Sequence, residues 1–247
     1  ASPAELGGMA RVVMLCLSDT AAVEAVLFGE QGLASALPAG SHVIDTSTIS
    51  ASATREHARR LAERGVALLD APVSGGQQAA EQGSLSCMVG ATQTAFDACQ
   101  PYLQAIASRV VRVGDNGAGQ VAKACNQVAV SAVMLGVAEA FSLARSSGVD
   151  PAAVREALLG GAARSAVLEK NALRLLEGDF KPGFRAGLMR KDLRLALDAA
   201  RDAGACLPMA ANTLQWLEAA CNTGRAEQDW SVVGQLIADM ARPAAQD

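Results

Sequence analysis

Three short apolar runs, each closed by polar residues, set the strongest limit on how this 247-residue chain can fold. They cover residues 11–17, 41–45 and 66–70, and the last two end in aspartate. Helical patterns follow each run, and buried strands that alternate with helices are typical of a parallel α/β sheet. Ligands bind such sheets outside the carboxyl ends of the strands. The sequence therefore predicts an α/β fold whose functional edge follows these three strands.

The pattern changes from mixed to purely helical near residues 114–119. Before this point we expect further strands at residues 85–89 and 109–113, and helices at residues 20–28, 52–64 and 92–106. After it we expect helices alone, at residues 120–147, from Pro151 onward, and at residues 186–203 and 207–223. We therefore predict a partial Rossmann-type, dinucleotide-binding domain over residues 1–116 and an all-helical substrate and oligomerisation domain over residues 117–247.

Composition and charge exclude several classes of function. The net charge is −4 and the basic residues are scattered, so nucleic acid is not an expected partner. The six cysteines form no CxxC pair and no metal-ligand spacing with the two histidines, so we expect free thiols and no metal. The longest apolar run, residues 128–138, is too short to cross a bilayer, and no signal peptide is visible at the start. These features favour a soluble cytoplasmic protein with no membrane partner.

The decapeptide GAGQVAKACN, residues 117–126, opens the long helical stretch with one ammonium and one amide. Lys123 and Asn126 are three residues apart and therefore share a face of a helix. Desolvation among apolar neighbours lowers the pKa of an ammonium group, which makes Lys123 a candidate general acid or base. The alternative is a lysine whose head reaches water and has no chemical role. The decapeptide alone does not decide between the two.

Three further segments carry polar side chains at turns or on a helix. The segment DAPVSGG, residues 70–76, allows a turn whose N–H groups and Ser74 hydroxyl could bind an anion, although an ordinary glycine-rich loop has the same composition. The segment DTSTIS, residues 45–50, could contact a cofactor or simply cap the next helix. Lys191 and Asp192 fit either a site or a solvated helix face with charge pairs.

In this order along the chain, DTSTIS, DAPVSGG, GAGQVAKACN and KDLRLA resemble the β-hydroxyacid dehydrogenase family, which includes 3-hydroxyisobutyrate dehydrogenase and tartronate semialdehyde reductase. The resemblance implies that Lys123 is the catalytic group and that the substrate is bound by Ser74, Gly75, Gly76 and Asn126. It implies cofactor contacts from Leu17, Ser18, Thr48, Lys191 and Asp192. Ser18 replaces a proline that is frequent in the family.

The resemblance further implies hydride transfer between NAD or NADP and a small β-hydroxy acid, of either the 3-hydroxyisobutyrate type or the tartronate semialdehyde and glycerate type. One departure matters, because the chain has no GxGxxG turn for the dinucleotide pyrophosphate. A catalytically silent binding or scaffold relative is therefore the alternative. Lys123 disfavours imine reductases, which carry another residue there. The apolar helix at residues 120–147 is expected to be buried all round. Its own helical domain can supply this burial, but the resemblance favours a contact between the subunits of a homodimer or homotetramer.

Overall fold

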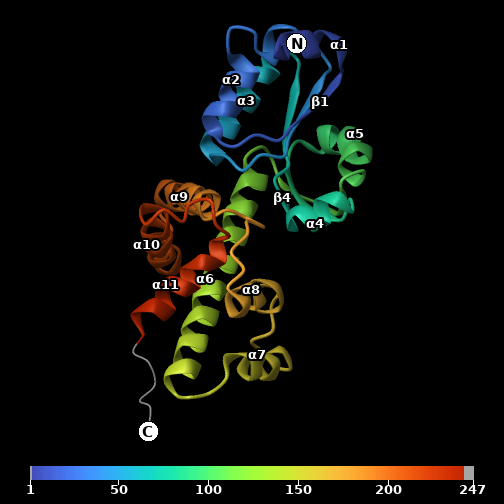
Figure 1. Ribbon diagram of the computed structural model, residues 1–247. Helices are drawn as coiled ribbons and strands as arrows, with labels where there is room; N and C mark the ends of the chain where they lie inside the picture. Colours follow the sequence, from blue (N-terminus) through green and yellow to red (C-terminus); the bar gives the residue numbers. More distant parts are fainter. Residues whose placement is uncertain (1, 242–247) are drawn as a thin grey trace. The chain divides into compact units, whose positions relative to one another are not determined.

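The structure is a computed structural model that describes residues 2–241. It separates into two compact units, Ala1–Cys125 and Asn126–Asp247, and the boundary falls inside the long helix α6 (Ala118–Ser146). The strands of the first unit are β1 (Val12–Leu15), β2 (His42–Asp45), β3 (Ala67–Asp70), β4 (Val73–Ser74), β5 (Leu85–Gly90) and β6 (Ala107–Gly114). Its helices before α6 are α1 (Pro3–Met9), α2 (Thr20–Phe28), η1 (Leu33–Ser35), α3 (Ala51–Ala62), α4 (Gly76–Glu81) and α5 (Gln93–Gln104) (Figure 1).

The first three strands pair in parallel and end in one row. Leu15 lies opposite Asp45, and Asp45 lies opposite Asp70. Beyond β3 the sheet is mixed, because β5 pairs antiparallel with β3 and β4 and parallel with β6. The chain reverses direction within residues 71–84, and helix α5 then supplies the crossover that parallel neighbours require. The predicted α/β organisation is confirmed, with a sheet that is mixed rather than wholly parallel.

Helices cover both faces of this sheet, which explains why β2 and β3 bury consecutive apolar residues. Val43 and Leu68 pack in a core formed with α2 and α3. Their chain neighbours Ile44 and Leu69 belong to a second core, formed with β5 and α5. Successive side chains of a strand point to opposite faces, so both residues of each pair are buried. The two groups of helices flank the strands in Figure 1.

Side-chain caps explain where several helices begin. Asp19 accepts from the N–H of Ala22 at 2.9 Å and starts α2 at the position that the sequence predicts. Ser50 caps α3 and Thr92 caps α5 in the same way. Helix α1 is missing from the sequence prediction although its signal is present, because Ser2 and Glu5 form a capping box.

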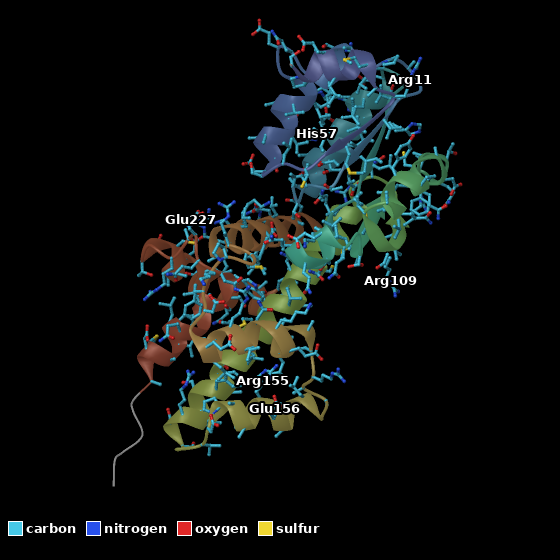
Figure 2. The ribbon with its side chains drawn as sticks, turned by 45° about the vertical axis from the view of Figure 1, so that its right-hand side comes forward. Arg11, His57, Arg109, Arg155, Glu156 and Glu227 are labelled. Carbon is cyan, nitrogen blue, oxygen red and sulfur yellow. The ribbon has the colours of Figure 1, made fainter. Side chains whose placement is uncertain are left out.

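The second unit is helical, as predicted, and no strand follows Gly114 within residues 2–241. Its elements after α6 are α7 (Pro151–Leu159), the π-helix η2 (Val167–Asn171), α8 (Ala172–Glu177), α9 (Ala186–Ala203), α10 (Pro208–Asn222), η3 (Trp230–Val232) and α11 (Val233–Met240). Phe141 of α6 is fully buried in the core that these helices share. Arg155 of α7, labelled in Figure 2, donates to the carbonyls of Leu168 and Glu169 at 3.1 and 2.8 Å and so satisfies oxygens of the π-helix.

Helix α6 differs from expectation in two respects. Its 29 residues are together long and apolar enough to cross a membrane, although residues 128–138 alone are not. The core helix of a soluble protein has the same length and composition, and Met134, Leu135 and Phe141 lie in the core of the second unit. Within a single chain α6 is not buried all round, because Val133 and Leu143 are 38% and 69% exposed, so the expected burial of this face stays a prediction that requires a second chain.

Candidate active site

The loops that follow β1 and β2 are joined by hydrogen bonds at the carboxyl edge of the sheet. Thr46 Oγ1 donates to the carbonyl of Leu15 at 2.7 Å, and the N–H of Leu17 donates to Ser47 Oγ at 2.8 Å. The two loops carry three of the predicted cofactor residues, Leu17, Ser18 and Thr48. Because short polar side chains bridge the loops, their backbones hold a fixed spacing at the strand ends.

Gln120, in the first turn of α6, fastens this helix to the loop after β2. Its Nε2 donates to the carbonyl of Ser47 at 2.8 Å, and its Oε1 accepts from the N–H of Ile49 at 3.1 Å. The side chain is buried, and both ends of its amide are therefore satisfied. Thr48 lies between the two bonded residues, so Gln120 holds the backbone on either side of it.

Lys123 lies one turn further along α6, and its side chain contacts the short strand β4. Its Nζ donates to the carbonyl of Val73 at 2.9 Å, and the residue is 8% exposed. Val73 directly precedes Ser74, so the ammonium is held next to the predicted substrate loop. Gly75 and Gly76 have φ values of 139° and 72°, and an added Cβ at Gly75 would lie 2.6 Å from the Ala79 side chain. Only glycine adopts this turn without strain.

Asp70, the last residue of β3, binds the start of the same helix. Its Oδ1 accepts from the N–H of Gly117 at 2.8 Å and its Oδ2 accepts from the N–H of Gln120 at 3.1 Å. Burial raises the pKa of this carboxyl group, and the hydrogen bonds from Gly117 and Gln120 oppose that rise. An acceptor at a helix start is electrostatically favourable, since unpaired N–H groups gather there.

The second unit holds the remaining predicted residues in a separate chain of contacts. Asn126 Nδ2 donates to Gln127 Oε1 at 2.8 Å, and Gln127 Nε2 donates to Asp192 Oδ2 at 2.7 Å. Lys191 Nζ lies 3.1 Å from the other oxygen, Asp192 Oδ1. This oxygen is buried and accepts no hydrogen bond of good geometry from the described residues, so the ion pair alone compensates it. A ligand with an N–H or O–H donor fits such an acceptor.

The structure thus places the predicted site residues in two groups, one in each unit. Lys123 and Asn126 lie three residues apart on α6, as their spacing predicts. The sequence reasoning missed Gln120 and Gln127, and it gave Asp70 no role. A signal for the two glutamines was present, because they are seven residues apart, with Lys123 between them, on an otherwise apolar helix.

Comparison with protein families divides the chain in a similar way. Residues 1–114 match a family model described as the NAD binding domain of 6-phosphogluconate dehydrogenase. Residues 117–237 match one described as the NAD-binding part of NADP-dependent 3-hydroxyisobutyrate dehydrogenase. Both matches therefore connect the chain with pyridine dinucleotides.

Individual relatives agree with these matches. The chain is 38% identical to a 2-hydroxy-3-oxopropionate reductase of Escherichia coli K12, over 93% of this chain and 79% of the relative. A crystal structure of a 3-hydroxyisobutyrate dehydrogenase from Salmonella typhimurium is 32% identical with a TM-score of 0.86, covering 96% and 82% of the two chains. A 3-hydroxyisobutyrate dehydrogenase of Mycobacterium tuberculosis, solved with L-serine, is 30% identical with a TM-score of 0.87, covering 95% and 81%.

A sheet whose strands end at shared loops, together with two NAD-binding matches, defines an NAD(P)-dependent dehydrogenase. The chain belongs to the β-hydroxyacid dehydrogenase family, as the four motifs predict. Its cofactor is NAD or NADP, and its reaction is that of a hydroxyacid dehydrogenase.

Proposed function

We propose that the chain interconverts a small β-hydroxy acid and its semialdehyde, with Lys123 as the general acid and base. The contact of its Nζ with the Val73 carbonyl, beside the Ser74 turn, is the observation that supports this role most directly. In oxidation the neutral amine takes the proton of the substrate hydroxyl. In reduction the ammonium returns that proton to the forming alkoxide. The dinucleotide, when bound, accepts or supplies the hydride.

Substrate binding is assigned to the turn after β4 and to the amide of Asn126. The Ser74 hydroxyl and the N–H groups of Gly75 and Gly76 are donors suited to a carboxylate, which accepts several hydrogen bonds. Gly75 and Gly76 are exposed, so a ligand can reach their backbone. The Asn126 side chain offers both a donor and an acceptor, which suits a hydroxyl group that becomes a carbonyl.

Cofactor binding is assigned to Leu17, Ser18, Thr48, Lys191 and Asp192. Leu17, Ser18 and Thr48 lie on the loops at the carboxyl ends of β1 and β2, where dinucleotides bind α/β sheets. Lys191 and Asp192 lie on α9, and Asp192 Oδ1, which is ion-paired with Lys191 but accepts no hydrogen bond from the described residues, fits a ligand donor. Lys191 supplies a positive charge that suits the phosphates or the carboxylate of a ligand.

The substrate is proposed to be of the tartronate semialdehyde and glycerate type or of the 3-hydroxyisobutyrate type. The first matches the name of the Escherichia coli relative, and the second matches the two solved structures. Steady-state rates with glycerate, 3-hydroxyisobutyrate and L-serine, each with NAD and with NADP, rank these candidates by kcat/KM. Equal kcat/KM for matched alcohols that lack the carboxylate would contradict the assignment of the Ser74 turn.

The role of Lys123 is tested with Lys123→Met, which keeps an unbranched apolar stem and removes the amine. We expect kcat to fall by at least about 10²-fold, the usual contribution of positioned proton transfer, with little change in dinucleotide affinity. Lys181→Met is the matched control, because that lysine is exposed in the second unit. Equal turnover of the two variants would remove Lys123 from the chemistry.

We also propose a homodimer or homotetramer in the cytoplasm. The exposed apolar side chains Val133 and Leu143 on α6 support self-association. The cysteines of the described residues are free thiols, and Cys87 and Cys99 are buried, which suits a reducing compartment.

A further inference from the structure

The start of α6 is held by a carboxylate from another element. Asp70 is fully buried, and it accepts from the N–H groups of Gly117 and Gln120 at 2.8 and 3.1 Å. These donors lie 47 and 50 residues further along the chain. A cap of this kind fixes the helix to the end of β3, whereas a cap from the preceding loop would leave the helix free to shift with that loop.

The contact between this helix start and the strands is as close as backbone allows. A Cβ on Gly119 would lie 2.5 Å from the Met88 carbonyl oxygen and 2.6 Å from that of Asp70. A Cβ on Gly90 would lie 2.6 Å from both carboxylate oxygens of Asp70. The Met88 and Asp70 carbonyl oxygens belong to the backbone and cannot rotate away as a side chain can. Helix α6 can therefore pack against β3 and β5 in only one position.

The same two segments meet again one turn later, at the proposed catalytic group. The Asp70 contact with Gln120 and the Val73 contact with Lys123 both join residues 50 positions apart. The three residues from Asp70 to Val73 therefore run alongside the three residues from Gln120 to Lys123. The Gln120 amide adds a second attachment, to the loop between Ser47 and Ile49.

We infer that Asp70 and Gln120 are positioning residues for proton transfer, because they fix the first turn of α6 and thereby hold the Lys123 ammonium beside the Ser74 turn. This inference rests on the proposed role of Lys123 as general acid and base. Asp70 and Gln120 touch neither substrate nor cofactor in this scheme. They act through the geometry of Lys123, and a displacement of a reacting group by about 1 Å can lower a rate about 10²-fold.

The test compares Asp70→Asn and Gln120→Leu with the control Asp150→Asn. Asp150 caps α7, which carries none of the proposed site residues, through an N–H bond from Ala152 at 2.9 Å. We expect kcat to fall about 10²-fold in the first two variants, with KM for the hydroxy acid changed less than about threefold, and the control to keep its kcat. The pH optimum of kcat is expected to move in both variants and to stay in the control.

A second readout needs no turnover. The chain has four lysines, Lys123, Lys170, Lys181 and Lys191, so ¹³C-lysine labelling gives four assignable ε-methylene signals. We expect the Lys123 signal to shift in Asp70→Asn and Gln120→Leu and to remain in place in Asp150→Asn. If Asp70→Asn does not fold, Gln120→Leu decides alone, because it leaves the backbone N–H groups that Asp70 caps.

The outcomes separate this inference from the proposed function. If Lys123→Met keeps full turnover, the proposed function fails whatever the other variants show. If Lys123→Met is inactive while Asp70→Asn and Gln120→Leu match Asp150→Asn in kcat, pH profile and Lys123 signal, the positioning role is overturned and the catalytic role stands.

Discussion

At the scale of single residues, His57 shows how burial can outweigh an attractive charge. Its Nε2 lies 2.8 Å from the Glu24 carboxylate, and its ring packs against Phe28 at 5.7 Å between centroids. Burial nevertheless lowers the pKa of His57 below its ordinary value, the Glu24 contact opposes this, and Arg60 adds to the lowering. Nδ1 also accepts or donates no hydrogen bond within the described residues. Figure 2 labels His57 in the first unit.

This lowered pKa predicts a loss of stability on acidification. The unfolded chain binds the His57 proton at higher pH than the folded chain, so the free energy of unfolding falls as the pH drops below about 6.5 and stops falling below the folded pKa. His57→Gln should show a smaller fall, and Glu24→Gln a larger one, in urea titrations between pH 7.5 and about 5. Identical pH dependence in all three proteins would refute the assignment.

At the scale of elements, two glycines of α6 have opposite effects on stability. Gly119 lies where the helix meets the carbonyls of Met88 and Asp70, and an added methyl group has no room there. Gly136 lies further along the same helix, and a Cβ at that position would meet nothing within 4 Å. The first glycine is required by close packing within the chain. The second has no packing requirement within the chain, where it weakens the helix.

The pair gives a matched prediction for stability. Gly119→Ala should lower the free energy of unfolding by about 1–3 kcal/mol, the usual effect of overpacking, because two backbone oxygens must move. Gly136→Ala should raise it by about 0.5–1 kcal/mol, since alanine favours a helix interior. Urea denaturation of both variants measures the difference. Equal free energies of unfolding for the two variants would mean that α6 packs less closely against the strands than the contacts of Gly119 indicate.

At the scale of the whole molecule, the exposed side of α6 supports assembly. Ala129, Val133, Gly136 and Leu143 recur at spacings of three, four and seven residues and are exposed, so they form a strip on one face that is apolar except for the exposed Glu139. The strip contains the small residues that let two helices approach closely.

Light scattering should therefore report a mass of at least two chains. Leu143→Glu together with Val133→Glu should shift the protein toward the monomer, because charges would be buried in the contact. Leu173→Glu is the control, since Leu173 is an exposed leucine on α8 outside the strip. A wild-type chain that is strictly monomeric at micromolar concentration would contradict this proposal.

Much of the first unit could be predicted from local pattern. Continuous apolar runs at Val12–Leu15, His42–Asp45 and Ala67–Asp70 predicted three strands, and their polar ends marked the loops. The second and third strands are buried on both faces, whereas Met14 of the first is 40% exposed. The short β4 and α4 and the reversal of β5 were missed, because pairing direction depends on residues distant in sequence. Neither element is long enough to carry a periodic pattern.

The sequence by itself determined the family, the order of elements and the residues suited to chemistry, because four motifs keep their side-chain types in fixed order. Only the tertiary structure decided that Lys123 meets the Val73 carbonyl and that Asp70 caps the helix carrying it. These contacts join residues about fifty positions apart. They come within hydrogen-bond distance only because the start of the helix packs against the strand ends, and local sequence propensities do not predict such packing.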